Sequence, residues 1–140
     1  MIKGLLHAAL STRSMEASLR FYRDMLGGRL IVQVDEPAGR PLAELLQFED
    51  GTCLELFHPR EDAPFGADCG RNHLCFTVDD MAALEKKLEE NGVAIDTRPR
   101  VARDGNLQMW CVDPNGYRVE FMQLDPNGPQ MKKGPVVKLG

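Results

Sequence analysis

Two histidines and two glutamates in this chain lie inside short apolar runs at matched spacing. His7 precedes His73 by 66 residues, and Glu55 precedes Glu120 by 65 residues. These nearly equal offsets indicate an internal duplication in which each half supplies one imidazole and one carboxylate. The two donor types together suit a divalent ion such as Ni, Co, Zn, Mn or Fe. We therefore predict a metal site formed by His7, Glu55, His73 and Glu120, and no residues that bind another cofactor.

The apolar flanks of these four residues are typical of β-strands. Leu54 and Leu56 flank Glu55, for example, and Val119 and Phe121 flank Glu120. Successive side chains of a strand point to opposite faces of the sheet, so each ligand candidate faces away from its apolar neighbours. A single His or Glu on a strand usually faces solvent. The paired repeat is what favours a metal centre on the concave side of a sheet.

The first half of the chain predicts a βαβββ unit. A strand over residues about 3–12 precedes a helix that Ser14 can cap and that Gly27 and Gly28 end. Three strands follow, with Glu49-Asp50-Gly51 as a hairpin turn between the last two. The predicted helix covers residues 15–26, and the three strands cover residues 29–34, 42–48 and 52–57.

The second half predicts the same plan after a Pro- and Gly-rich linker over residues 58–71. Asp79 or Asp80 caps a helix that Gly92 ends, and the turn Asp113-Pro114-Asn115-Gly116 joins the last two strands. The predicted strands cover residues 73–78, 94–98, 107–112 and 117–123, and the helix covers residues 81–91. We predict one domain over residues 1–125, with modules 1–60 and 70–125, followed by a C-terminal tail over residues 126–140.

Four segments carry a resemblance to a known family. They are His7 with the helix S-L-R-F-Y-R-D-M-L-G-G (18–28), E-L-F (55–57), N-H-L-C-F-T-V-D-D (72–80) and D-P-N-G-Y-R-V-E-F (113–121). Together they resemble the glyoxalase, or vicinal oxygen chelate, superfamily. The resemblance implies an α+β fold in which two tandem βαβββ modules form an open, barrel-like mixed sheet around a divalent metal ion.

The resemblance also implies a mechanism. The complete His-Glu-His-Glu set is similar to the glyoxalase I and epimerase branches, in which four protein ligands leave two positions of an octahedral ion for substrate oxygens. Chelation there acidifies the C–H next to a carbonyl, and a carboxylate removes the proton to form an enediolate. The resemblance implies Glu120 as that carboxylate, with Glu55 as the second choice. The chain lacks the inserted segments associated with zinc-type glyoxalases, which favours Ni or Co over Zn.

The substrate is not specified by the same residues. Glutathione-dependent members carry an Arg four positions after the first His and an Asn shortly after the first Glu, whereas this chain has Ser11 and then His58-Pro59. His58 and several arginines are candidates to bind a carboxylate or phosphate of a different small molecule. These arginines are Arg13, Arg40, Arg60, Arg71, Arg98, Arg100 and Arg103.

The leading interpretation is a lactoylglutathione lyase-like, metal-dependent lyase or isomerase. The alternatives are an epimerase of the methylmalonyl-CoA type, a ring-cleaving dioxygenase, a thiol transferase, and a non-catalytic protein that binds a drug or metabolite. The dioxygenases and transferases usually use two His and one Glu, so Glu55 argues against them. Drug-binding members typically lack the metal ligands, which are all present here.

Composition constrains the partners and the compartment. The chain has 140 residues and a formal net charge of -4, so we expect no nucleic-acid or membrane partner. It has no apolar run long enough for a membrane span, and its four cysteines form no C-x-x-C pair. We expect a cytoplasmic protein with reduced thiols. By resemblance to short bacterial glyoxalases, we expect a homodimer with the metal site at the subunit interface.

Overall fold

The computed structural model describes residues 6–61 and 73–131. The chain divides into two compact units, Met1–Asp68 and Cys69–Gly140. Each unit contains one four-stranded mixed sheet and one helical segment, in the order βαβββ. The predicted α+β class with two tandem βαβββ modules is therefore confirmed. Most of the predicted linker, including Arg71 and Cys69, lies outside the described residues, and so does the tail beyond residue 131.

In unit 1 the strand order is β1-β4-β3-β2, with β1 parallel to β4 and the other pairs antiparallel. Turn chemistry explains the hairpin between β3 and β4: the Asp50 carboxylate accepts from the Thr52 amide at 2.9 Å, and Gly51 adopts a φ of +89°. The elements are β1 (His7–Ser11), α1 (Met15–Leu19), η1 (Arg20–Met25), β2 (Arg29–Asp35), β3 (Pro41–Gln47) and β4 (Cys53–Phe57).

Unit 2 repeats this topology with the order β5-β8-β7-β6, and β5 is parallel to β8. The Asp80 side chain caps α2 by accepting from the Ala83 amide at 3.0 Å. The Met81 amide donates to Gln123 on β8 at 2.8 Å, which ties the start of the helix to the sheet. The elements are β5 (His73–Thr77), α2 (Met81–Glu90), β6 (Ile95–Val101), β7 (Leu107–Val112) and β8 (Arg118–Gln123).

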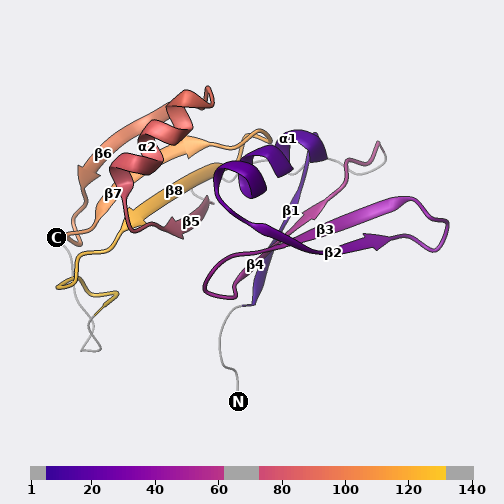
Figure 1. The fold of residues 1–140 in the computed structure, drawn as a ribbon, viewed down its shortest axis with the longest axis horizontal. Helices are drawn as coiled ribbons and strands as arrows, with labels where there is room; N and C mark the ends of the chain where they lie inside the picture. The colour runs from indigo at the N-terminus through magenta and orange to yellow at the C-terminus, as the bar shows by residue number, and fades with distance from the viewer. Residues whose placement is uncertain (1–5, 62–72, 132–140) are drawn as a thin grey trace, which may run out of the picture. The chain divides into compact units, whose positions relative to one another are not determined.

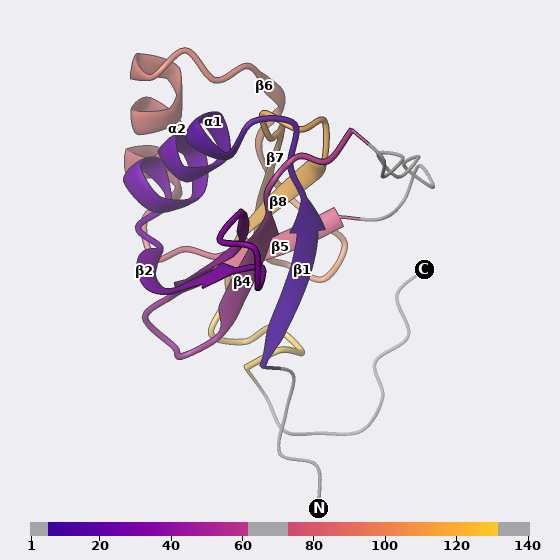
Figure 2. The ribbon, with the colours of Figure 1, turned by 90° about the vertical axis from the view of Figure 1, so that its right-hand side faces the viewer.

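In each unit the helix covers one face of the sheet (Figure 1, Figure 2). Strand register and alternation assign the ligand candidates to the other face. The covered face is apolar because alternate strand residues point to it. Burying these side chains removes apolar surface from water, which is the dominant favourable term in folding. The core residues are Phe21, Tyr22, Leu46, Leu54 and Leu56 in unit 1, and Met81, Leu88, Met109, Cys111, Val119 and Phe121 in unit 2.

The first helix differs from the prediction of one α-helix over residues 15–26. It is α-helical only as far as Leu19 and continues as a π-helical turn over Arg20–Met25. The chain must then approach the sheet closely: a Cβ at Gly28 would lie 2.9 Å from the Tyr22 carbonyl oxygen and 3.3 Å from Leu46. The wider turn and the glycine together admit this approach.

One further predicted boundary is wrong. The strand predicted over residues 94–98 continues to Val101, because Arg100 and Val101 pair with β7 beyond Pro99. At the end of the predicted domain the Asp125 amide donates to the Asn106 side chain at 2.9 Å, and in the predicted tail Gln130 donates to Asp104 at 2.8 Å. Among the described helices, none has the length and hydrophobicity that a membrane span requires.

Candidate metal centre

His7 and Glu55 lie together on the open face of unit 1. His7 begins β1, and Glu55 is at the centre of β4, opposite Ala9 in the parallel register. His7 Nε2 is 3.7 Å from Glu55 Oε2, and both side chains are partly exposed, 44% and 27% respectively. The first predicted pair is therefore brought together by two neighbouring strands.

His73 and Glu120 form the equivalent pair in unit 2. His73 begins β5, and Glu120 on β8 lies opposite Cys75, again two residues beyond the histidine. The Nε2 to Oε2 distance is 3.1 Å, and the Glu120 side chain is only 6% exposed. Because the two units share the same strand register, the near-equal spacing in the sequence places a His–Glu pair at equivalent strand positions in each unit.

One of the two His–Glu separations fits donors that share one ion. Two ligands at metal distances of about 2.0–2.2 Å lie about 3.0 Å apart at adjacent octahedral positions and about 3.4 Å apart in a tetrahedron. The His73–Glu120 distance of 3.1 Å matches this range, and the His7–Glu55 distance of 3.7 Å is slightly longer. Within the part of the chain that the structure describes, no group of three or more His, Cys, Asp or Glu side chains gathers. Each unit thus supplies half of the predicted ligand set.

The two carboxylates have different surroundings. Gln108 on β7 donates a hydrogen bond from Nε2 to Glu120 Oε1, and Oε2 of the same carboxylate faces His73. Position 43, which occupies the corresponding place in unit 1, is an alanine and makes no such contact. Glu120 is therefore held in place from two sides, whereas Glu55 keeps more freedom to move.

Cys75 adjoins the Glu120 carboxylate. Although Cys75 is partly exposed, desolvation of its sulfur raises the pKa of the thiol to about 12, and the charge of Glu120 and a hydrogen bond to it add to the rise. The thiol therefore stays protonated at neutral pH in the metal-free protein, where it acts as a neighbour of Glu120 and not as a thiolate ligand.

An aromatic side chain supports the second histidine. The ring centroids of His73 and Trp110 are 4.8 Å apart with an interplanar angle of 62°, and the Arg118 guanidinium lies 4.3 Å over the Trp110 ring. These contacts restrict the orientation of the imidazole. Gln108, Trp110 and Arg118 were not identified from the sequence. The sequence feature that could have identified Gln108 and Trp110 is the alternation along β7, where they alternate with the buried residues Met109 and Cys111.

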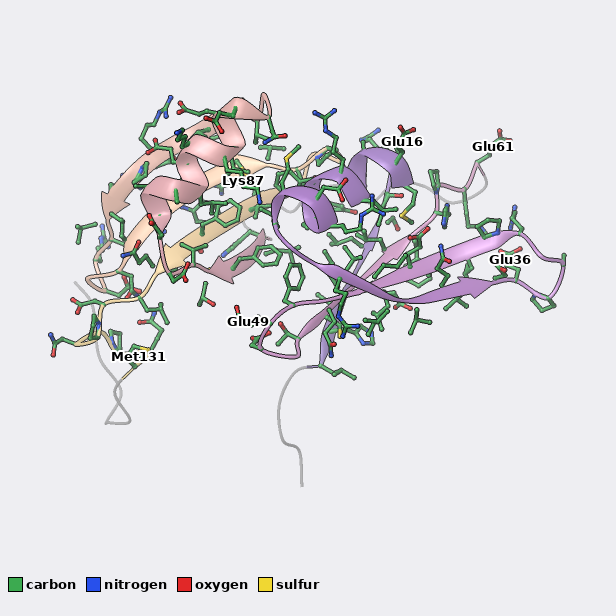
Figure 3. All side chains as sticks on the ribbon, in the orientation of Figure 1. Glu16, Glu36, Glu49, Glu61, Lys87 and Met131 are labelled. Carbon is green, nitrogen blue, oxygen red and sulfur yellow. The ribbon has the colours of Figure 1, made fainter. Side chains whose placement is uncertain are left out.

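Several side chains suggested as substrate contacts are engaged elsewhere. His58 Nε2 lies 3.4 Å from Glu44, and Glu44 is opposite Leu56, on the helix-covered face of β3. Arg40 and Arg60 both pair with Glu36, which lies between β2 and β3 (Figure 3).

Three arginines of β6 and the following loop have different surroundings. Arg98 pairs with Glu85 and Glu89 of α2. Arg100 and Arg103 instead line a cavity in unit 2. Among Arg40, Arg60, Arg98, Arg100 and Arg103, the two that border a space for a ligand are Arg100 and Arg103.

Comparison with known proteins establishes the family. Residues 4–121 match the model of the Glyoxalase/Bleomycin resistance protein/Dioxygenase superfamily. The chain belongs to this superfamily. It is 29% identical over 123 residues to a lactoylglutathione lyase of Neisseria meningitidis, covering 85% of this chain and 89% of the relative. It is also 29% identical over 135 residues to an ethylmalonyl-CoA/methylmalonyl-CoA epimerase of Cereibacter sphaeroides, covering 89% of this chain and all of the relative.

A solved structure supports the same fold. The lactoylglutathione lyase of Agrobacterium tumefaciens aligns with a TM-score of 0.66 at 23% identity, covering 87% of this chain and 94% of that one. This similarity concerns the fold alone. Because the similar curated proteins carry different activities, the choice among reactions depends on the residues of this chain.

Proposed function

We propose that this protein is a metal-dependent lyase or isomerase of the glyoxalase type that removes a proton next to a carbonyl. The observation that carries the proposal is the repeated His–Glu pair, placed at the same strand register on the open face of each unit. We further propose that His7, Glu55, His73 and Glu120 together hold one divalent ion, with Ni or Co favoured over Zn. Such an ion, when bound, would polarise the substrate carbonyl and stabilise the enediolate left by proton removal.

Glu120 is the proposed base. Its carboxylate is almost fully buried, and Gln108 fixes one of its oxygens by a hydrogen bond. A proton taken from the substrate would therefore reside at a defined atom, from which it can return to the neighbouring carbon. Gln108 also lines the cavity of unit 2, so a molecule bound there lies beside Glu120. Glu55, which is more exposed and less restrained, is the second choice.

The proposal is tested by measuring exchange of the substrate α-proton with deuterated solvent. The protein is loaded with Ni or Co, and NMR of the substrate monitors the exchange. The compounds to compare are hemithioacetals, acyl-CoA thioesters and keto-sugars. Wild-type protein is expected to exchange the α-proton for deuterium. Glu120→Gln is expected to lower the exchange rate about 10²–10⁴-fold while keeping much of its metal affinity, since an amide oxygen still coordinates. Glu55→Gln is the matched variant in the other unit.

The same assay separates the alternatives. A compound that is turned over with no solvent exchange, and at a similar rate by Glu120→Gln, would contradict the isomerase proposal and favour a dioxygenase or transferase reaction. Exchange that returns the opposite configuration at the α-carbon indicates an epimerase, the activity named for the Cereibacter sphaeroides relative. Tight binding without exchange or turnover indicates a binding protein. With Ser11 and His58-Pro59 in place of the usual anchors, we expect weak or no activity on the glutathione adduct of methylglyoxal.

A further inference from the structure

Unit 2 carries an open cavity beside Gln108, the residue that donates a hydrogen bond to Glu120. Its volume is about 500 Å³. Residues of β7 and β8 line it together with the end of β6 and the loop that follows. The residues that line it are Arg100, Val101, Ala102, Arg103, Asp104, Gln108 and Met122. The cavity therefore has two guanidinium groups and one carboxylate on its surface.

A change of register in β6 directs Arg100 to this face. Thr97 lies opposite Trp110 and Arg100 opposite Gln108, so three residues of β6 advance where β7 advances by two. An extra residue of this kind reverses which face the following side chains occupy. Arg98 therefore points to the helix face, where it pairs with Glu85, while Arg100 shares the open face with Gln108.

The charge of the cavity is available to a ligand. Neither Arg100 nor Arg103 has an ion-pair partner among residues 6–61 and 73–131. The carboxylate of Asp104 is already engaged, because it accepts from Asn106 at 2.7 Å and from Gln130 at 2.8 Å. These hydrogen bonds lower the pKa of Asp104. The two guanidinium groups thus have donors for an anionic group that enters the cavity.

The strand register gives the distance between the cavity and Glu120, the proposed base. Met122, Gln108 and Arg100 form one row across β8, β7 and β6, and Glu120 and Trp110 belong to the next row. Adjacent rows on one face are two residues apart, about 7 Å, and two strand spacings are about 10 Å. An anion at Arg100 therefore lies several bonds from a carbon that Glu120 deprotonates.

We propose that this cavity binds the anionic end, a carboxylate or a phosphate, of the small molecule that reacts at Glu120. The substrate class is then a carbonyl compound with its anionic group several bonds from the acidic C–H. This inference rests on the proposed function for the identity of the reacting end, but the anion site itself is independent of the metal. Arg100 supplies a guanidinium from the sheet and Arg103 supplies one from the loop.

The test uses inorganic phosphate and succinate as separate probes of metal-free protein, so that no metal ion competes for them. Backbone amide shifts in ¹H–¹⁵N NMR spectra report the location and the affinity of each probe. Amides of residues 101–108 are expected to move on titration. Arg100→Gln and Arg103→Gln are each expected to raise the dissociation constant about 10-fold or more, because each removes a charge-assisted contact.

Arg98→Gln is the matched control, since it removes the same charge from the same strand on the opposite face. It is expected to leave the affinity unchanged within about 2-fold, as for screened surface charges. Binding of phosphate alone, or of succinate alone, supports the site and identifies its anion. The proposal is overturned if neither probe moves residues 101–108, or if Arg100→Gln and Arg103→Gln bind as wild type does.

A second arm separates this proposal from the proposed function. Solvent exchange is measured on metal-loaded protein with dihydroxyacetone and with dihydroxyacetone phosphate. Selective loss of exchange on the phosphate ester in Arg100→Gln supports both proposals. Anion binding that depends on Arg100, without exchange on any carbonyl compound, supports the anion site and contradicts the proton-abstraction chemistry. Equal exchange on both compounds, unaffected by Arg100→Gln, overturns the anion site and leaves the chemistry supported.

Discussion

Replacing Asn106 with alanine tests whether one buried amide holds the cavity wall to the segment after β8. Asn106 is 0% exposed. Its Nδ2 donates to Asp104 at 2.7 Å and to Gln130 at 2.9 Å, and its Oδ1 accepts from the Asp125 amide at 2.9 Å. The side chain thus joins three positions up to 24 residues away.

The expected cost follows from these contacts. Two neutral hydrogen bonds contribute about 1 kcal/mol each and the bond to a carboxylate about 1.5 kcal/mol or more, so Asn106→Ala should lower the free energy of unfolding by about 3 kcal/mol. At about 2.1 cal/mol/K per residue, this corresponds to a drop in Tm of about 10 °C if the chain unfolds cooperatively. Urea denaturation of metal-free protein, followed by circular dichroism, measures the change.

Asn127→Ala is the matched control, because Asn127 is exposed and its side chain has no partner among the described residues. It should change the stability by less than about 0.5 kcal/mol. Asn106→Asp should destabilise the protein at pH 7 by placing two carboxylates in contact, and part of that loss should be recovered on acidification. If Asn106→Ala unfolds at the same urea concentration as Asn127→Ala, the inferred role of the amide is refuted.

Three further predictions concern the metal, the assembly and the pH dependence. His7→Ala and His73→Ala should each weaken binding of Ni or Co by about 10–100-fold or more. Chelator competition measures the affinity, and metal binding should also quench Trp110 fluorescence, since Trp110 adjoins His73. Wild-type protein that holds no metal after reconstitution would contradict the site. A homodimer with shared sites should appear in light scattering, and a mixture of inactive Glu55 and Glu120 variants should partly recover activity; an active monomer would rule out shared sites. Hydrogen bonds from Gln130 and Asn106 lower the pKa of Asp104 from 3.8. The ionised Asp104 therefore stabilises the folded state above about pH 4, and this stabilisation is lost as the pH falls through the folded pKa. The difference in urea stability between wild type and Asp104→Asn should shrink between pH 7 and pH 3, and a constant difference would show that the charge contributes nothing.

Local sequence patterns determined much of the fold of each unit. The period of two placed each of His7, Glu55, His73 and Glu120 opposite its apolar neighbours, and the duplication predicted the matched pairs. Turn residues and caps, such as Gly51 and Asp80, fixed where strands and helices meet. These features depend on a few consecutive residues, and the chemistry of those residues is visible in the sequence itself.

Tertiary structure decided the features that depend on register between strands and on contacts between distant segments. Nothing local distinguishes Arg98 from Arg100, since only the irregular pairing with β7 sends them to opposite faces. The hydrogen bond from Gln108 to Glu120 spans 12 residues, and that from Asn106 to Gln130 spans 24. The close approach of Gly28 to Leu46 likewise joins two different elements. Sequence periodicity assigns a side chain to a face, whereas the partner it meets there depends on the relative shift of neighbouring strands.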